Sequence, residues 1–158
     1  MDRSEILQMI RNAAERYGID PAIVFGVCMQ ESSLNPKATR YERNYKWLWK
    51  PSMVLRPKGI DTATETMDQK TSWGLMQVMG AVFREYGYAD HIHDVLKFPE
   101  VQLDYGCRHL ARRIAKWGRN PGILAYNSGT PRRNGNGEFV NAYYLEKVMR
   151  YSKGYQSA

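Results

Sequence analysis

The stretch Asp20–Pro36, DPAIVFGVCMQESSLNP, is the one around which we expect the rest of the chain to fold. Asp20 suits the N-cap of a helix, and Pro21 suits its first turn, where a missing N–H costs nothing. The run from Ala22 to Met29 is apolar on every side. A helix with no polar face is surrounded by other elements, so the sequence predicts a buried helix here.

Glu31 lies shortly before the expected end of this helix, which we place at Asn35–Pro36. Burial disfavours the charged form of its carboxyl group, and so does the negative end of the helix dipole. Both effects raise its pKa, which suits a group that must donate a proton near neutral pH. The alternative is that Glu31 emerges at the surface and is solvated or paired with a cation.

Composition favours one compact domain over residues 1–158, because 43% of the 158 residues are hydrophobic and can form a core. No apolar run approaches the roughly 18 residues of a membrane span. The N-terminal 18 residues have charges where a signal peptide needs an apolar segment, so we expect a helix and no export signal. Cys28 and Cys107 are far apart and outside any CxxC pair, which predicts two free buried thiols.

The formal net charge is +7, and most of the excess lies after residue 107. This excess indicates a polyanionic partner: nucleic acid, an anionic cell envelope or a membrane surface. The basic residues of this part are Arg108, Arg112, Arg113, Lys116, Arg119, Arg132, Arg133, Lys147, Arg150 and Lys153.

The remaining pattern predicts a mainly α fold. Apolar residues at helical spacing predict a first helix that ends at Gly18. A longer helix is predicted from Pro99 to Gly118, with its arginines on the solvent-facing side. Further helices are expected over 73–86, from Asn120 to Tyr126, and at the end of the chain. In that last helix four apolar residues are expected to share one face: Val140, Tyr144, Val148 and Tyr151.

Residues 37–71 show neither helical nor strand periodicity and predict a long irregular insert. Its first half, residues 41–49, interleaves aromatic with charged side chains. Such a segment could stack on sugar rings or bases, or its aromatics could fold back onto the core.

Three polar residues interrupt apolar surroundings: Glu31, Gln77 and Asn127. Buried polar groups need partners, so three of them facing one cleft would indicate a ligand that forms hydrogen bonds. His91 and His93 lack a third ligand at a suitable spacing, and we interpret them as part of an exposed loop. No metal or other cofactor is expected, and no Ser/His/Asp set or phosphate-binding loop is present in the sequence.

Four segments in order resemble the motifs of the soluble lytic transglycosylase (SLT) catalytic domain family. They are Glu31–Pro36 (ESSLNP), Ser72–Met79 (SWGLMQVM), Ala125–Gly129 (AYNSG) and Tyr144–Val148 (YLEKV). The wording SWGLMQVMG and the aromatic insert are most similar to phage and prophage members. Ser128, where many members have alanine, is a small departure.

The resemblance implies a lysozyme-like helical fold that cleaves the MurNAc–GlcNAc bond of peptidoglycan. It implies that Glu31 is the catalytic acid and base, and that the product carries 1,6-anhydro-MurNAc. It also implies substrate-binding roles, which fall on Ser72, Gly74, Leu75, Met76, Gln77, Tyr126, Asn127 and Tyr144. The alternative for Tyr126 and Tyr144 is core packing with a satisfied hydroxyl group.

Two alternatives remain open. A hydrolytic, goose-type-like lysozyme needs a second carboxylate, for which the insert offers Glu65; otherwise Glu65 is a solvated loop charge. A protein of another class would be a non-catalytic glycan- or nucleic-acid-binding phage protein, although no nucleic-acid-binding motif occurs and we expect no such partner. We expect a monomer that is made in the host cytoplasm and acts on cell-wall peptidoglycan, as a phage lysin or virion component.

Overall fold

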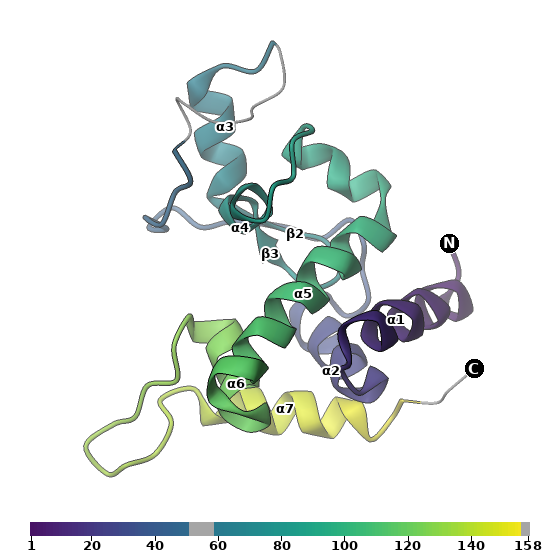
Figure 1. Cartoon of the computed structure of the whole chain (residues 1–158), viewed down its shortest axis with the longest axis vertical. Helices are drawn as coiled ribbons and strands as arrows, with labels where there is room; N and C mark the ends of the chain where they lie inside the picture. The colour runs from purple at the N-terminus through teal and green to yellow at the C-terminus, as the bar shows by residue number, and fades with distance from the viewer. Residues whose placement is uncertain (51–58, 156–158) are drawn as a thin grey trace.

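Helices make up most of the chain, as the sequence predicts (Figure 1). The computed structural model describes residues 1–50 and 59–155. The α-helices are α1 (Arg3–Tyr17), α2 (Pro21–Ser32), α3 (Thr62–Gln69), α4 (Gly80–Glu85), α5 (Pro99–Trp117), α6 (Arg119–Ser128) and α7 (Ala142–Ser152), and a 3-10 helix, η1, covers Ile92–Lys97.

Helix α2 is the buried helix that its sequence predicts. Its residues from Ile23 to Cys28 are all buried, and α1 and α7 pack against it. The Asp20 carboxylate caps it by accepting a hydrogen bond of 2.9 Å from the N–H of Ala22. The helix ends at Ser32, earlier than expected, because Ser33 and Leu34 both adopt the left-handed conformation, with φ of 54° and 63°.

A close approach of α2 to α7 brings together the two helices that carry Glu31 and Tyr144. Gly26 makes this approach possible, because a Cβ atom there would lie 2.4 Å from the carbonyl oxygen of Val148. Any larger residue at this position would push the two helices apart.

The prediction of a helix over 73–86 is wrong in its first half. Strand β2 (Thr71–Trp73) turns into β3 (Val78–Met79), and α4 begins only at Gly80. Strand β1 (Thr39–Tyr41) pairs with β2 in antiparallel register to complete a small sheet of order β1-β2-β3. A short apolar run does not distinguish strand from helix by periodicity, and here the turn decides, with positive φ at Gly74 and Gln77.

The insert over 37–71 is less irregular than predicted. It contains β1 and α3, and Asp61 caps α3 by accepting from the N–H of Thr64. Residues 51–58 of the insert lie outside the described residues.

Helix α5 crosses the middle of the molecule between the part that contains α3 and the part that contains α6 (Figure 1). The apolar spacing of this helix predicts an inward stripe of Leu103, Cys107, Leu110, Ile114 and Trp117. The first three are fully buried, whereas Ile114 and Trp117 are half-buried. Cys28 and Cys107 are both free and buried, as expected.

The predicted apolar face of the last helix is only partly correct. Tyr144 and Val148 are buried, whereas Tyr151 is exposed and Val140 is exposed and precedes α7. Across the two described stretches of chain, no helix is both long enough and apolar enough to cross a membrane.

Candidate active site

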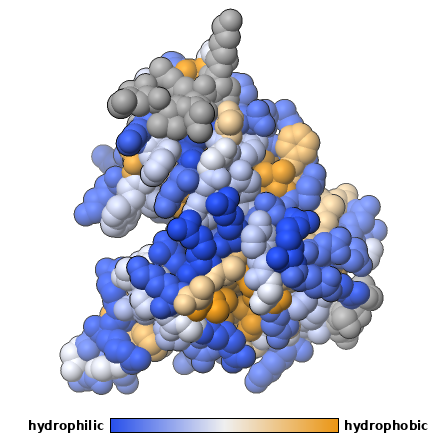
Figure 2. All heavy atoms as spheres, viewed as in Figure 1, coloured by the Kyte–Doolittle hydropathy of each residue, from blue (hydrophilic) through white to orange (hydrophobic). Residues whose placement is uncertain are grey.

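A cleft of about 1160 Å³ separates the part of the molecule with the insert from the part with α6. One wall comes from residues 38–47 and the β2–β3 hairpin, the other from residues 126–132, and Glu31 lies between them. Figure 2 shows a notch in the surface at this position, lined mainly by hydrophilic residues.

Glu31 lies in the last turn of α2 and is half-buried. Burial raises the pKa of its carboxyl group, and two smaller effects oppose this rise. The hydroxyl group of Tyr144 donates a hydrogen bond of 2.7 Å to Oε1, and the positive charge of Arg40 favours the carboxylate. The net result is a carboxyl group with a raised pKa that lines the cleft, as a general acid requires.

Tyr144 is 2% exposed, and burial raises its own pKa far above the usual value, an effect that the neighbouring Glu31 charge strengthens. Its hydroxyl group therefore stays protonated and acts as a donor. Tyr144 does not line the cleft, so its contact is with the glutamate rather than with a ligand.

The β2–β3 hairpin is tied to the helices that border the cleft. The hydroxyl group of Ser32 donates to the carbonyl oxygen of Leu75 at 2.8 Å, and that of Tyr126 donates to the carbonyl of Met76 at 2.6 Å. The side chains of Leu75 and Met76 are fully buried. These two residues and Gly74, for which the resemblance implies substrate-binding roles, are not among the residues that line the cleft, and their backbone connects the hairpin to α2 and α6.

Gly74 must be glycine for two reasons. It has a φ of 75°, and a Cβ atom would lie 2.1 Å from Oε1 of Gln102. Gln102, fully buried, accepts from the N–H of Leu75 at 2.8 Å. A buried glutamine on α5 therefore fixes the turn.

Ser72 and Gln77 do line the cleft. The hydroxyl group of Ser72 donates to Oε1 of Gln77 at 2.8 Å, and Nε2 of Gln77 donates to the carbonyl oxygens of Ala38 and Gly74. The amide of Gln77 is thus held by the hairpin itself, with only part of its surface exposed.

Tyr126 and Asn127 line the opposite wall, at the end of α6. Tyr126 is half-buried with its hydroxyl group satisfied, and Asn127 is exposed. Oδ1 of Asn127 accepts from Asn141 at 3.0 Å, which leaves its amide N–H₂ group directed toward other partners.

Glu65 is not in the cleft, and it is not a solvated loop charge either. It is 1% exposed and accepts two hydrogen bonds from the buried Arg84, at 2.7 and 3.1 Å. A third comes from Gln69 at 3.0 Å. These contacts make Glu65 a buried partner of Arg84 rather than a carboxylate facing Glu31.

Two residues of α5 line the cleft without having been predicted to do so, His109 and Arg113. Burial and, to a smaller extent, the charges of Arg113 and Arg112 together lower the pKa of His109 to about 3. His109 is therefore neutral at physiological pH and shares a hydrogen bond of 2.7 Å with the hydroxyl group of Tyr86. In the sequence, His109 is a polar residue next to Leu110 of the apolar stripe, and this position could have indicated a role in the site.

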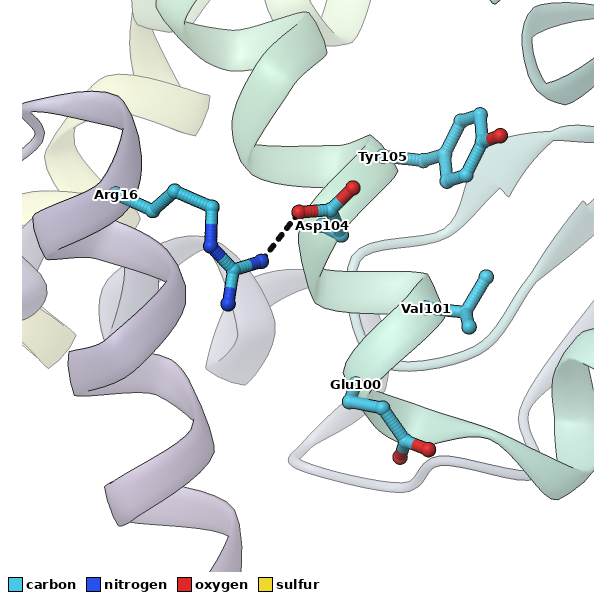
Figure 3. Close-up of a pocket in the computed structure, with 5 residues that line it drawn as sticks. All are labelled: Arg16, Glu100, Val101, Asp104 and Tyr105. Atoms are coloured by element: carbon cyan, nitrogen blue, oxygen red, sulfur yellow. Dashed lines mark hydrogen bonds and ion pairs between the residues drawn. The ribbon is translucent and has the colours of Figure 1, made fainter. Parts of the chain in front are cut away.

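A second, smaller hollow of about 280 Å³ lies between α1 and α5 (Figure 3). In it Arg16 of α1 points toward Asp104 of α5 and forms an ion pair, and Asp104 also accepts from the hydroxyl group of Tyr17 at 3.0 Å. Its carboxylate is thus satisfied by neighbours on α1, and the hollow has no group comparable to Glu31. Within residues 1–50 and 59–155, no three His, Cys, Asp or Glu side chains gather so as to hold a metal ion.

The geometry defines a class first: a helical protein with a polar cleft that Glu31 lines from the last turn of a buried helix. Two other glutamates line the cleft: the half-buried Glu42, which is paired with Arg40, and the exposed Glu85. Comparison with known families then identifies the family. Residues 8–144 match the family described as Transglycosylase SLT domain, which covers most of the chain, and the protein belongs to this family.

Similarity to individual proteins is local. A segment of 35 residues is 51% identical to membrane-bound lytic murein transglycosylase C of Haemophilus influenzae strains PittEE, PittGG and 86-028NP. The match covers 22% of this chain and 10% of each relative, so the chain spans about a tenth of the length of the curated relatives it matches. No solved structure matches the chain.

Proposed function

We propose that this protein is a lytic transglycosylase that cleaves the MurNAc-β-1,4-GlcNAc bond of peptidoglycan and leaves 1,6-anhydro-MurNAc at the new end. The observation that carries this proposal is the Glu31 carboxyl group, which has a raised pKa, lies in the cleft and accepts a hydrogen bond from Tyr144. Membership of the SLT family supports the same activity.

The proposed reaction uses Glu31 twice. As a carboxylic acid it donates its proton to the glycosidic oxygen, and the C1–O bond breaks through an oxocarbenium-like state. As a carboxylate it then takes the proton of the muramoyl C6 hydroxyl group, whose oxygen bonds to C1. Glu31 thus gives up one proton and takes one back, so it ends in its starting protonation state, and no water is consumed.

Tyr144 has a specific part in this scheme. Its hydrogen bond to Glu31 is stronger when Glu31 is ionised, because bonds to charged groups are the stronger ones. The hydroxyl group therefore stabilises the carboxylate that forms as the glycosidic oxygen is protonated. Gln77 and Asn127 are proposed to bind N-acetyl and hydroxyl groups of the sugars from opposite walls.

The hydrolytic alternative loses its candidate residue, because Glu65 is paired with Arg84 and does not line the cleft.

Further proposals concern the origin of the enzyme, its oligomeric state and its place of action. We propose a phage-associated, monomeric enzyme that acts on cell-wall peptidoglycan and is drawn to the anionic envelope by its basic residues, rather than a nucleic-acid binder.

Mass spectrometry of digested sacculi tests the proposal. The expected muropeptides end in 1,6-anhydro-MurNAc and are about 18 Da lighter than hydrolytic products, because no water is added. Glu31→Gln is the control, and it should lower the rate by at least ~10²–10⁴-fold because general acid–base help is lost. Products dominated by reducing-end MurNAc would overturn transglycosylation, and no cleavage by the parent protein would overturn the activity as a whole.

A further inference from the structure

We propose that Trp47 is a stacking platform for a sugar ring of the glycan strand, held at the cleft by a buried chain of side chains that includes Glu65. This inference rests on the proposed function and deepens it, because it names a specificity-determining residue outside the motifs of the family. It also gives Glu65 a role in positioning.

Trp47 is the starting observation. It lines the cleft, yet 69% of it is exposed, more than any other large hydrophobic side chain of the described residues. An indole ring in water at the wall of a polar cleft is the kind of apolar surface that ligands cover. Core packing, the alternative that the sequence left open for the aromatics of the insert, does not apply to Trp47.

Neighbouring side chains contact the ring of Trp47 but leave most of it exposed to solvent. Tyr45 contacts it in an edge arrangement, with ring centroids 5.5 Å apart and planes at 67°. Nζ of Lys46 lies over the ring, 5.3 Å from its centroid, and so occupies one of its two faces. With 69% of the side chain still exposed, apolar ring surface remains for the C–H groups of a pyranose, which complement the negative face of an aromatic ring.

The segment that carries Trp47 is anchored on both sides. Before it, the N–H of Glu42 donates to the carbonyl oxygen of Lys70 at 2.8 Å. After it, the fully buried Gln69 binds both backbone groups of Trp49: Oε1 accepts from the N–H at 2.6 Å, and Nε2 donates to the carbonyl at 3.0 Å. One side-chain amide thus pairs with the peptide groups of Trp49 in the way that a neighbouring strand would.

The side chain of Gln69 is held by a second set of buried contacts. Its Nε2 donates to Oε1 of Glu65 at 3.0 Å, and Glu65 is bound by Arg84. Arg84 also donates to the carbonyl oxygens of Tyr88 and Asp90, which connects the chain of contacts to the segment after α4. We infer that this buried chain sets the position of Trp47, because it joins the residues that follow Trp47 to α3 and α4.

The occupant is a sugar rather than a nucleic-acid base because of what shares the cleft. Trp47 faces the same space as Glu31, Gln77 and Asn127, which suits a polymer with hydroxyl and amide groups. A platform beyond the reacting bond binds substrate and transition state alike, so its removal is expected to raise KM and leave kcat nearly unchanged.

The first test is kinetic, on soluble uncross-linked glycan strands. Trp47→Ala is expected to raise KM roughly tenfold, or about 1.4 kcal/mol, with kcat within about twofold of the parent. Trp47→Phe should recover most of the loss. The matched control is Tyr143→Ala, since Tyr143 is 57% exposed with Lys147 over its ring, as Lys46 is over Trp47, but is not in the cleft.

The second test measures binding without turnover. In the Glu31→Gln background, chitohexaose should shift the fluorescence of the exposed Trp47 to shorter wavelength, and adding Trp47→Phe should remove that shift. Gln69→Met, which cannot bind Trp49, should raise KM in the otherwise unchanged protein by several-fold. In a double mutant with Trp47→Ala it should add nothing further, because both changes act through the same platform.

The outcomes separate the two proposals. If the parent cleaves glycan strands and Trp47→Ala has an unchanged KM, the platform is wrong and the proposed function stands. If KM effects of Gln69→Met and Trp47→Ala simply add, Gln69 does not act through Trp47. If the parent neither cleaves nor binds glycans, the proposed function fails and this inference fails with it.

Discussion

The hydroxyl group of Tyr144 donates a hydrogen bond of 2.7 Å to Oε1 of Glu31, although 113 positions separate the two residues in the chain. The packing of α7 on α2 brings them together, and the bond favours the ionised form of a carboxyl group whose pKa burial raises. Tyr144 thus adjusts the acidity of Glu31.

The first prediction concerns this bond. Tyr144→Phe should raise the pKa of Glu31 further, because the substitution removes a contribution that lowers it. The alkaline limb of the pH–rate profile, which reports loss of the acid form, should move to higher pH, and the maximal rate should fall by roughly tenfold as a hydrogen bond to a charged group is lost. Tyr126→Phe is the control, since its hydroxyl group binds the carbonyl of Met76 instead. Equal pH profiles for the two variants would contradict the role of Tyr144.

The sequence predicts those parts of the structure that depend on residues close together in the chain. Helix α2, its cap at Asp20 and the raised pKa of Glu31 follow from residues within a dozen positions of one another, and the structure agrees with each. The stripe of α5 likewise follows from helical spacing.

The β2–β3 hairpin and the pairing of Glu65 could not be predicted in the same way. The hairpin forms because Gln102 of α5 and Ala38 of the insert satisfy the backbone of Gly74 and Leu75, and such partners are not visible in the local pattern. Glu65 and Arg84 are 19 positions apart and on different helices, so neither residue alone indicates a buried pair. The site roles of Ser72, Gln77, Tyr126, Asn127 and Tyr144 remain predictions.

The second prediction is a pH-dependent gain in stability. In the unfolded chain Glu31 titrates near its usual value of 4.5, and burial raises the pKa in the folded state. At pH values below both the unfolded and the folded pKa, the carboxyl group of Glu31 is protonated in the unfolded and in the folded state, and its burial costs little free energy. As pH rises above 4.5, the unfolded chain gives up this proton before the folded protein does, so stability falls until the pH exceeds the raised pKa of the folded state; above that the native state holds a half-buried charge. Glu31→Gln, which is neutral throughout, should therefore raise Tm more at about pH 7 than at about pH 4. Thermal unfolding at both values measures this, and a Tm difference that shrinks as pH rises would contradict it.

The third prediction links helix packing to the site. Gly26→Ala places a Cβ atom 2.4 Å from the carbonyl oxygen of Val148, so α2 and α7 must separate. Overpacking of this kind costs ~1–3 kcal/mol, and the Glu31–Tyr144 bond should lengthen with it. Chemical denaturation gives the loss of stability, and the rate on sacculi should fall as well. Gly135→Ala is a suitable control because its Cβ atom would meet nothing within 4 Å and its φ is not positive. A fully active, fully stable Gly26→Ala variant would show that the helices tolerate separation.

The fourth prediction concerns the basic face of α5 and α6. Arg108, Arg112 and Arg119 are exposed, and the first two lie over the ring of Tyr86 at 4.6 and 5.0 Å. If this face draws the enzyme to an anionic envelope, activity on whole sacculi should fall with salt, since the screening length drops from about 10 Å at 0.1 M to 3 Å at 1 M. Activity on uncharged chitooligosaccharides should change little. The same salt response on both substrates would mean that the face is only a solvated surface. Arg113 is set apart, because it is half-buried and lines the cleft.

The last prediction separates a structural Glu65 from a catalytic one. Glu65→Gln leaves the buried Arg84 without its counter-charge, and breaking a buried ion pair from one side costs ~3–5 kcal/mol. The double variant Glu65→Leu/Arg84→Met should lose less, because no uncompensated charge stays buried. At a temperature where Glu65→Gln is still folded, we expect it to cleave glycan strands with the same anhydro products as the parent and with a raised KM. Urea unfolding gives the stabilities, and mass spectrometry gives the products. A folded Glu65→Gln variant that binds chitohexaose normally but no longer cleaves would make Glu65 part of the chemistry, and would return hydrolysis with two carboxylates to consideration.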